Sequence, residues 1–473
     1  MQEKSVNTRL ALGYGVGVVG EGIGYNIFYS FFVYFLVNIA GIDSVIAGTI
    51  SLLAVIWDGI TDPMIGYFSD HTRNPKGRRR PLLFKGAFIW CLAIILMFRD
   101  VPLEGTAKVV YFVFLNVIFW FSGTMCVIPH SSLGADLTDD YNGRNKLRTF
   151  AAFGLNIGML IATGVTLMVV SFFQNLTDGT EKSGWAYTAL VYGLIVLAAY
   201  MITYFSTKGR EKANPNIGKP SDGKFSLGMV LKEYFESFRN SPFRKLLIAT
   251  VIVNFVVGVA SSLNVYMYTE AYGFSDATSS LMYTINGFSL LGFTVVTGLI
   301  VNKLGKKATM AMGLVIYGVA YLIVQFLPLN YTTAVLNAVL VGWGSATYWT
   351  LLYSMCYDCG IVSMLKSGES KDGLYTSAIG FFMKFGTAIG MWIVGFGLDF
   401  IHYDPALAAQ TAETLSGLRL LFTLPNGIIL LIGAAVMLRY GMDKKAYTAL
   451  EAAYEKKQKG EAYDLGEYAG MIR

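Results

Sequence analysis

The stretch VIAGTISLLAVIWDGITDPMIGYFSDHTRNPKGRRR, residues 45–80, decides what kind of fold this chain can have. Its first part is apolar and long enough to cross a bilayer as a helix, which takes about 20 residues. Its end is strongly basic, which is typical of a loop on the cytoplasmic side of a membrane. Two acids, Asp58 and Asp62, nevertheless lie inside the apolar part, four residues apart and therefore on one helix face. A carboxylate inside a bilayer costs about 2.5–3.5 kcal/mol on insertion scales, so the pair is predicted to be functional.

The composition extends this prediction to the whole chain. Of the 473 residues, 54% are hydrophobic and only 14% are charged, whereas soluble domains carry about 25% charged residues. The mean hydropathy is +0.51. No cleavable signal peptide is expected, because no small-residue cleavage site follows the first apolar run. The net charge of +6 is explained by basic loops better than by a nucleic-acid partner. All four cysteines fall in apolar surroundings, and Cys356 and Cys359 in a CxxC are interpreted as two inert helix thiols rather than as a redox or metal motif.

Twelve apolar segments are predicted to span the membrane. The longest connection separates the sixth from the seventh, which divides the chain into a six-helix half at 1–206, a cytoplasmic linker at 207–243, a second six-helix half at 244–440 and a cytoplasmic tail at 441–473. Within the linker, SLGMVLKEYFESFRN predicts a short amphipathic helix on the membrane surface. The predicted spans lie near 11–38, 45–67, 82–99, 107–134, 147–174, 184–206, 244–271, 277–301, 307–328, 331–357, 374–401 and 416–440.

Lysine and arginine mark one side of the membrane, and a repeat appears there. The loops after spans two, four and eight and the central linker are basic, whereas the opposite connections are poor in Lys and Arg. Both termini are therefore predicted to be cytoplasmic, in a multi-pass protein of the inner (plasma) membrane. GYFSDHTRNPKGRRR (66–80) and GLIVNKLGKK (298–307) both place Asp or Asn four residues after Gly and then Gly before basic residues. Two parallel six-span repeats around a mid-membrane substrate site resemble the plan of the major facilitator transporters.

Five motifs carry a closer resemblance, in order along nearly the whole chain. Together they are similar to the glycoside–pentoside–hexuronide:cation symporters, the family that includes the melibiose permease. The resemblance implies an all-α membrane protein with twelve transmembrane helices in the major facilitator fold. It implies a non-enzyme without a cofactor, which moves a sugar or glycoside with a coupling cation, Na⁺, Li⁺ or H⁺. The motifs are GYGVGVVGEGIGYN (13–26), WDGITDPMIGYFSD (57–70), GRRRP (77–81), DLTDDYNGRNKLR (136–148) and KDGLYTSAIGFFMKFGTAIG (371–390).

The resemblance also implies roles for single residues. The two acids of the WDxxxDP segment, which match Asp58 and Asp62, bind the coupling cation in that family. A threonine on helix four that helps to hold the cation matches Thr124. A lysine on helix eleven, paired with the same acids, matches Lys384. An arginine on helix five near the sugar matches Arg148.

Two positions depart from the melibiose-type pattern. That pattern has an aspartate on helix one at the place of Val18 and another on helix four at the place of Val127. The chain thus keeps the two positively charged side chains in its spans, Arg148 and Lys384. It lacks the two acidic side chains that face the sugar in such relatives. Because Arg suits the bidentate recognition of a carboxylate or sulfonate, an anionic substrate is favoured: a uronide, an oligouronide or a sulfonated sugar.

The acid pair has a physical interpretation of its own. Two carboxylates one helix turn apart in a low dielectric repel each other and need a partner. That partner can be a bound Na⁺, a proton on one acid or the ammonium of Lys384. Exchange of one such partner for another would act as a cation switch. Hard oxygen ligands suit a hard monovalent cation, and no His or Cys cluster indicates a transition metal. The structural alternative is that Asp58 faces a structural arginine and Asp62 ends a helix before Pro63.

Other polar residues in the spans have two interpretations each. Glu21 lies one turn from Val18 and replaces the lost acid as a ligand, or it bonds a neighbouring helix. Arg148 binds substrate, or it pairs with Asp136, Asp139 or Asp140 or extends to the interface. His130 relays a proton or bonds a neighbouring carbonyl. The remaining substrate candidates are aromatic or amide side chains that otherwise pack or join helices: Tyr25, Asn26, Trp349 and Tyr353.

The basic loop after span two is predicted to serve as a gate. In major facilitator proteins this loop pairs with acids at helix ends and steadies the outward-open state. Asp70, Arg73 and Arg78 are the candidates here. The alternative is a positive anchor on lipid headgroups.

Two rival functions remain for the whole chain. A cation-coupled lysolipid transporter would need an apolar side opening, and its uptake would not be competed by sugars. A non-transporting sugar sensor would bind sugar saturably without cation-driven accumulation. An enzyme is disfavoured, because the sequence contains no metal motif, nucleophile elbow or phosphate loop, and its polar loops are too small for a catalytic domain.

Overall fold

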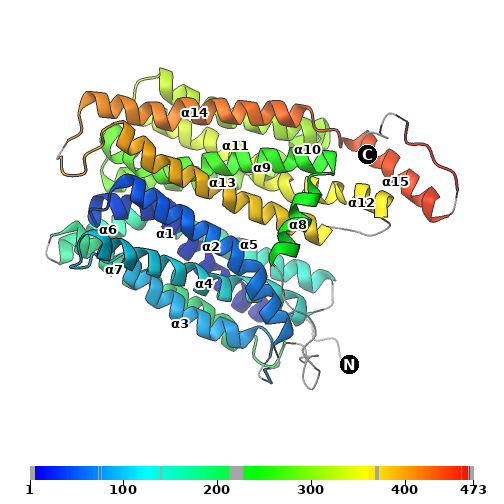
Figure 1. Cartoon of the computed structure of the whole chain (residues 1–473), viewed down its shortest axis with the longest axis horizontal. Coiled ribbons are helices and arrows are strands. Elements are labelled where there is room, and N and C mark those ends of the chain that lie inside the picture. Colours follow the sequence, from blue (N-terminus) through cyan, green and yellow to red (C-terminus); the bar gives the residue numbers. More distant parts are fainter. Residues whose placement is uncertain are drawn as a thin grey trace. The chain divides into compact units, whose positions relative to one another are not determined.

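The computed structural model describes residues 6–72, 74–75, 77–138, 141–177, 179–211, 227–367, 372–407, 409–459, 461–466 and 468. Within these ranges the chain forms helices and no strand (Figure 1). The helices of the first half of the sequence are α1 (Thr8–Tyr34), η1 (Phe35–Ile39), α2 (Ser44–His71), α3 (Arg80–Met97), α4 (Gly105–Leu137), α5 (Tyr141–Gly164), α6 (Thr166–Leu176) and α7 (Glu181–Ser206). Those that follow are α8 (Leu227–Ser237), α9 (Ser241–Tyr266), η2 (Met267–Ala271), α10 (Asp276–Phe326), α11 (Tyr331–Asp358), α12 (Gly360–Ser367), α13 (Asp372–Phe400), α14 (Ala412–Leu438) and α15 (Lys444–Gln458).

The prediction of an all-α membrane protein is confirmed. Eleven of the described helical segments are long and apolar enough to cross a membrane. One of them, α10, has 51 residues and covers two predicted spans. It bends at Gly305, whose φ of 78° and ψ of 162° fall in a region that is essentially open only to glycine. Division at this glycine gives the twelve membrane helices of the predicted fold.

The predicted fifth span differs from the structure in one respect. It was expected as one helix over 147–174, but the chain forms α5 and then α6, with Val165 between them at φ −125° and ψ −6°. The Thr166 hydroxyl donates to the Ala162 carbonyl at 2.6 Å and lies 2.9 Å from the Tyr192 hydroxyl. These side-chain bonds satisfy polar groups at the break, which an isolated hydropathy pattern does not reveal.

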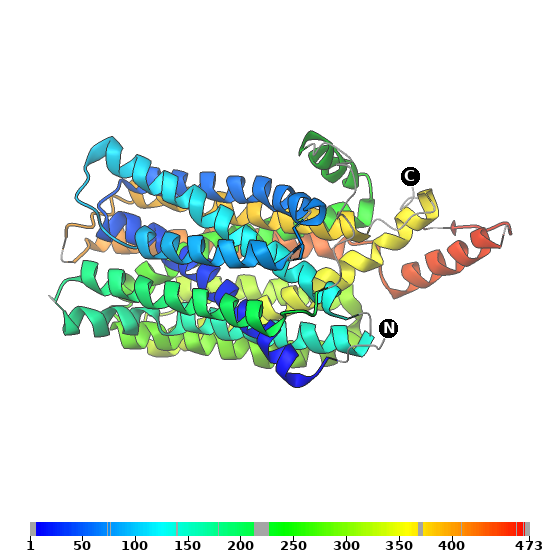
Figure 2. The same cartoon turned by 90° about the horizontal axis from the view of Figure 1, so that it is seen from below.

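The described residues form two compact units, which are described separately. The first comprises those within Met1–Leu227, Gly273–Thr284 and Trp392–Gln410, and the second those within Gly228–Tyr272, Ile285–Met391 and Thr411–Arg473. In the first unit α1 packs against α5 and α7, α3 against α4 and α7, and α2 against α4. Both views show α3 and α4 side by side (Figures 1 and 2). The predicted division at residues 206, 243 and 440 stays a prediction.

The first unit includes two short segments from late in the sequence. An added Cβ at Gly395 would lie 2.3 Å from the Ser44 carbonyl oxygen, so α13 and α2 approach backbone to backbone. Close approach at small residues is the usual way in which membrane helices pack. The Tyr403 hydroxyl then donates to Asn38 Oδ1 at 2.8 Å.

A second internal repeat appears at the ends of α1 and α9. The sequences VYFLVNIAG (33–41) and VYMYTEAYG (265–273) each end their helix in a π-helical turn, η1 and η2. The N–H of Ala40 donates to the Phe35 carbonyl at 2.9 Å, and the N–H of Tyr272 donates to the Met267 carbonyl at 2.9 Å. Gly41 and Gly273 follow, with φ of 67° and 64°. The matching geometry indicates that both sequence halves begin with the same structural unit.

Asp100, in the connection between α3 and α4, joins three segments of the first unit. Lys108 Nζ donates to Asp100 Oδ1 at 3.0 Å and to the Ala40 carbonyl at 2.9 Å, and Lys182 Nζ donates to Asp100 Oδ2 at 2.7 Å. Burial alone would raise the pKa of this carboxyl, but the hydrogen bonds and charges of both lysines lower it below its ordinary value.

This lowered pKa predicts a pH dependence of stability. A depressed folded-state pKa stabilises the fold above the unfolded pKa of about 3.9, and the contribution is lost as pH falls through the folded value. We expect Asp100→Asn to lower the melting temperature at pH 7 but not at the acid end of the range, because wild type loses the same contribution there. Thermal unfolding of the purified protein across pH 7 to 3 measures this. Glu104→Gln, at an exposed position of the same loop, is the control, and an equal deficit for Asp100→Asn at both ends would contradict the assignment.

Candidate functional site

The acid pair of α2 meets a hydroxyl from α4 inside the first unit. Asp58 is fully buried, and Asp62 is partly buried one turn later. Thr124 Oγ1 lies 2.9 Å from Asp58 Oδ1 and 3.2 Å from Asp62 Oδ1. A threonine hydroxyl has one proton to donate and two lone pairs, so it bonds one carboxylate at a time while it remains in contact with both. The arrangement collects three oxygens from two helices around one point.

Thr61 is a residue at this site that the sequence interpretation missed. Its hydroxyl is fully buried, lies 3.3 Å from Thr124 Oγ1 and donates to the Asp58 carbonyl at 3.2 Å. Its position in the WDGITDP segment, three residues after Asp58 on the same helical face, was the available signal. The site thus has four oxygen-bearing side chains, two anionic carboxylates and two neutral hydroxyls.

Proline shapes both helices near this oxygen cluster. Pro63 follows Asp62 inside α2, and Pro129 lies within α4. A proline inside a helix supplies no N–H and loosens the turn before it. The Gly59 carbonyl, four residues before Pro63, therefore has no helical donor from that position. The backbone at the acid pair therefore lacks one of the hydrogen bonds of a regular α-helix.

The candidates on α1 lie beside this cluster. The Tyr25 ring stacks on Trp120 of α4, with centroids 5.2 Å apart and an interplanar angle of 20°. The charges of Asp58, Asp62 and Glu21 all act on the Tyr25 hydroxyl. The roles of Tyr25 and Glu21 at this site stay predictions.

Asn26 is engaged within its own helix. Its Nδ2 donates to the Gly22 carbonyl at 2.8 Å. Such a bond is the ordinary way in which an amide is satisfied in an apolar span. The amide oxygen remains the part of Asn26 that a substrate hydroxyl would use, and its role as a substrate residue stays a prediction.

Arg148 lies at an exposed position of α5. Its charge acts on Tyr14 and His130, and that of Glu21 also acts on Tyr14. Of its three candidate acid partners, Asp136 pairs with Arg78 and Arg79, and Asp139 and Asp140 lie outside the described residues. Arg148 and Glu21 stand on α5 and α1, which pack against each other, and the role of Arg148 as a substrate residue stays a prediction.

His130 contacts a backbone carbonyl of a neighbouring helix, which was the second of its two interpretations. Its Nε2 lies 2.9 Å from the Tyr14 carbonyl oxygen, the two rings stack with centroids 4.3 Å apart, and the Tyr14 hydroxyl donates to the His130 carbonyl at 3.2 Å. The pair joins α1 to α4 through two hydrogen bonds and a ring contact.

The candidates on α11 and α13 belong to the second unit. Lys384 is partly buried on α13, and its charge acts on the Tyr353 hydroxyl of α11. Trp349 precedes Tyr353 by one turn and has 39% of its surface exposed. The Tyr353 hydroxyl donates to Sδ of Met383, the neighbour of Lys384 in the chain, at 4.0 Å. The pairing of Lys384 with the acids of the first unit stays a prediction.

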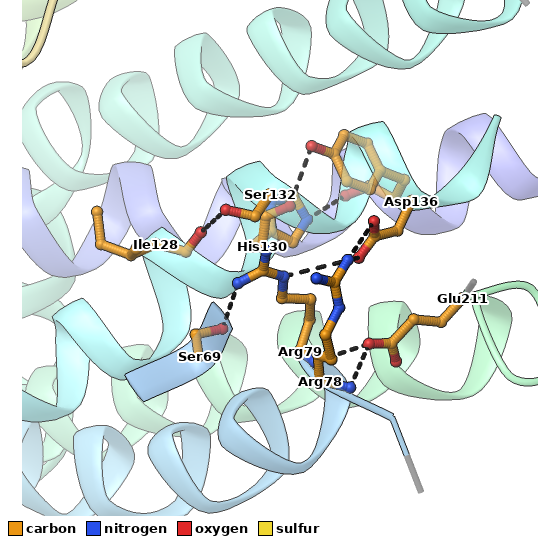
Figure 3. A network of polar contacts seen from close by, with 9 residues as sticks. Ser69, Arg78, Arg79, Ile128, His130, Ser132, Asp136 and Glu211 are labelled. Atoms are coloured by element: carbon orange, nitrogen blue, oxygen red, sulfur yellow. Dashed lines mark hydrogen bonds and ion pairs between the residues drawn. The ribbon is translucent and has the colours of Figure 1, made fainter. Parts of the chain in front are cut away.

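Arg78 and Arg79 of the basic loop form a network of hydrogen bonds inside the first unit (Figure 3). Arg78 Nη2 donates to both oxygens of Asp136, at 2.9 and 3.1 Å. Arg79 Nη1 donates to Ser69 Oγ at 2.6 Å. Glu211 Oε1 accepts from the backbone N–H groups of Arg78 and Arg79 at 2.6 and 2.8 Å, which caps the start of α3. The sequence interpretation named Arg78 but missed Glu211 and the specific partner Asp136.

The other two gate candidates have no described side chain. Arg73 and the Asp70 side chain lie outside what the structure describes. The following arginine, Arg80, donates from Nε and Nη2 to the Tyr204 carbonyl at 3.1 and 2.7 Å, with its guanidinium 4.3 Å from the Tyr204 ring centroid. Successive arginines of GRRR thus hold α4, α2 and α7.

The second sequence half has an equivalent ion pair. Lys306, in the basic run that was predicted to repeat GRRR, donates to both oxygens of Asp358 at 2.8 and 2.7 Å. Each basic run therefore binds an acid near the end of a later helix, Asp136 in one half and Asp358 in the other. The Lys306–Asp358 pair is more exposed, with 36% and 20% of the side chains accessible, against 17% and 9% for Arg78 and Asp136.

The chemistry available at the oxygen cluster is that of a hard monovalent cation or a proton. Across the described part of the chain, no group of three or more His, Cys, Asp or Glu side chains is placed to hold a metal ion. All four cysteines are buried free thiols. Two carboxylates and two hydroxyls offer hard oxygen ligands, which suit such a cation better than a transition metal.

Comparisons with known proteins identify the family of this chain. The family described as "MFS/sugar transport protein" matches residues 13–444. The "Uncharacterized symporter YjmB" of Bacillus subtilis (strain 168) is 27% identical over 92% of this chain and 92% of its own length. The "Isoprimeverose transporter" of Lactiplantibacillus pentosus is 26% identical over 89% and 86%. The "Putative sulfoquinovose importer" of Escherichia coli (strain K12) is 25% identical over 96% and 95%.

Solved structures share the fold at lower identity. A D-xylose-proton symporter superposes with a TM-score of 0.66 at 17% identity and covers 93% of this chain and 99% of its own. A bacterial homologue of the human lysosomal transporter Spinster superposes with a TM-score of 0.68 at 15% identity, over 92% and 97%. These likenesses support the twelve-helix fold.

Proposed function

Because the chain belongs to the MFS/sugar transport protein family, we propose that it is a secondary active transporter that moves a sugar or glycoside across the membrane together with a cation. The observation that carries the proposal is the Thr124 hydroxyl within hydrogen-bond distance of both Asp58 and Asp62. A buried acid pair with converging hydroxyls has no role in lipid packing and costs free energy unless it binds a positive charge.

The coupling follows from the electrostatics of this site. Na⁺ or H⁺ at Asp58 and Asp62 neutralises the pair and raises the affinity for substrate, and linkage makes the effect reciprocal. Lys384 neutralises the acids when the cation is absent and is released when it binds. The loaded protein then changes its access from one side of the membrane to the other and releases both solutes. The cation gradient drives the sugar into the cell, across the inner membrane, with both termini cytoplasmic.

An anionic sugar is the favoured substrate class. Val18 is buried on α1, and Val127 is partly buried on α4; neither supplies the acid that a melibiose-type site has there. Arg148 and Lys384 supply positive charge. One relative is named a putative sulfoquinovose importer, which supports a sulfonated sugar as a candidate beside uronides. The gate residues Asp70, Arg73 and Arg78 act at the basic loop in this proposal.

Uptake into right-side-out membrane vesicles tests the proposal. Radiolabelled glucuronide, sulfoquinovose and melibiose are offered with and without an imposed Na⁺ or H⁺ gradient. We expect accumulation only with one of the two gradients, and in favour of an anionic sugar, because the site lacks the two sugar-facing acids. Vesicles without the protein are the control. Equal filling with and without both gradients would overturn cation coupling, and a preference for melibiose would overturn the charge argument.

A further inference from the structure

Two helix ends from late in the sequence belong to the first unit. That unit includes Gly273–Thr284, which contains the start of α10, and Trp392–Gln410, which contains the end of α13, whereas the rest of both helices belongs to the second unit. Neither helix is interrupted where it passes from one unit to the other, because the non-helical residue of α10 is Gly305 and α13 is helical from Asp372 to Phe400. Hinges usually lie in loops or at the ends of elements, so each of these ends follows the rest of its helix when that helix moves.

The start of α10 contacts α5 and α6 through one stripe of side chains. Asp276, Ser280 and Thr284 are four residues apart and share a helix face. Asp276 Oδ2 accepts a hydrogen bond from the Ser171 hydroxyl of α6, and the Thr284 hydroxyl donates to the Gly164 carbonyl of α5 at 3.4 Å. Ser280, between them, is fully buried. Contacts at both ends of the stripe thus hold the first two turns of α10 against the first unit.

The end of α13 is held by a close backbone approach and by a hydrogen bond. Gly395 lies against the Ser44 carbonyl of α2. The Tyr403 hydroxyl, just beyond α13, donates to Asn38 Oδ1 at 2.8 Å. Asn38 belongs to the π-helical turn η1, and its Nδ2 donates to the Tyr34 carbonyl at 3.2 Å. This second bond orients the amide, so its oxygen is the acceptor that faces Tyr403.

The turn that positions Tyr403 has an unfavourable backbone conformation. His402 has a φ of 53°, and it is the only residue other than glycine with a positive φ in the described part of the chain. The N–H of His402 donates to the Asp399 carbonyl at 2.9 Å, and the N–H of Tyr403 donates to the Leu398 carbonyl at 3.0 Å. In such a helix end the left-handed position is usually glycine. Because strain of this kind is concentrated at functional sites, it points to a use for the Tyr403 contact.

We infer that the Asp276–Ser171 and Tyr403–Asn38 hydrogen bonds form a clasp that has to open in every transport cycle. Both lie near connections that follow odd-numbered spans, the first and the fifth. They are therefore on the side of the membrane opposite the basic loop, which the proposed orientation places outside. When the clasp opens, the two helix ends leave α5, α6 and η1 and move with the rest of α10 and α13. The inference rests on the proposed function, because a transport cycle requires this movement.

A reversible cross-link tests whether the clasp has to open. Ser171→Cys with Asp276→Cys is treated with a short bifunctional methanethiosulfonate reagent in the vesicles used for sugar uptake; the four native cysteines are buried. Gradient-driven uptake by the double variant should fall to background on cross-linking and return when a reductant removes the link. Each single cysteine variant, treated in the same way, should keep its uptake. Full uptake by the cross-linked protein would overturn the inference.

A second measurement reports on the clasp without transport. Ser280→Cys places a thiol on the buried stripe, and its rate of labelling by a water-soluble maleimide is measured on purified protein. In this background Tyr403→Phe keeps the ring and removes the hydroxyl, so the rate should rise roughly two- to tenfold, as expected for the loss of one hydrogen bond. Tyr187→Phe is the matched control, at a tyrosine that is 44% exposed and stacks on Phe173, and it should leave the rate unchanged.

The two measurements separate this inference from the proposed function. An unchanged labelling rate in Tyr403→Phe, in a protein that accumulates sugar under a gradient, would overturn the clasp alone. A raised labelling rate in a protein that accumulates no sugar under either gradient would overturn the proposed function and support the clasp as a contact that opens.

Discussion

Asp58→Asn should abolish the accumulation of substrate that a cation gradient drives. Asparagine keeps the shape of the side chain but removes its charge from a fully buried position. Removal of one charged partner from a buried set costs about 3–5 kcal/mol, which corresponds to a loss of roughly a hundredfold or more in cation affinity. The Thr124 hydroxyl can still donate to the Asn carbonyl oxygen, so the local fold should persist.

The measurement is uptake of the preferred sugar into vesicles under the gradient that drives the wild type. Asp399→Asn, an exposed carboxylate on α13, is the matched control and should accumulate sugar normally. Protein abundance in the membrane is measured in parallel. Wild-type accumulation by Asp58→Asn, with normal abundance, would show that the acid pair is structural and would leave the coupling cation without its proposed ligands.

Asp136→Asn should strongly destabilise the first unit. Asp136 receives two hydrogen bonds from Arg78, and its Oδ2 lies 3.6 Å from Arg79 Nε. Arg79 is 6% exposed and Asp136 is 8% exposed. Removal of the acid leaves two guanidinium groups in a poorly solvated place, which costs about 3–5 kcal/mol for a buried ion pair. The loss should appear as a large drop in melting temperature and in the yield of folded protein.

The repeat supplies the control for this second prediction. Asp358→Asn breaks the equivalent pair with Lys306, where 36% of the lysine side chain is exposed. Water can solvate that lysine after the change, so the expected cost is only about 0.2–1 kcal/mol. Thermal unfolding of the three purified proteins in one detergent compares them. Equal losses for the two variants would mean that burial does not decide the strength of these pairs.

The membrane topology could be predicted because it depends on local sequence. A helix in a bilayer satisfies its own backbone, so length and hydropathy alone indicate a span. The prediction separated the two spans of α10 correctly, on either side of Gly305, but it missed the break at Val165 in the fifth span. At Val165 the side-chain hydrogen bonds of Thr166, which hydropathy does not measure, accompany the end of one helix and the start of the next.

Part of the candidate site was also accessible from the sequence. The four-residue spacing of Asp58 and Asp62 determines that they share a helix face, and the resemblance to a known family pointed to Thr124. Thr61 had the same helical signal, but a threonine in a span more often bonds its own backbone. Glu211 carried no signal at all, because a single acid after a span is ordinary.

The sequence by itself determined the spans, the basic loops with their repeat, and the residues that place charge inside the membrane. Only the tertiary structure decided which side chains from different helices meet: Thr124 with the acid pair, Tyr25 with Trp120, and Arg78 with Asp136. The physical reason is that helical periodicity is set by neighbours along the chain, whereas the register between helices is set by packing at residues far apart in sequence, such as Gly123 beside the rings of Trp90 and Tyr25.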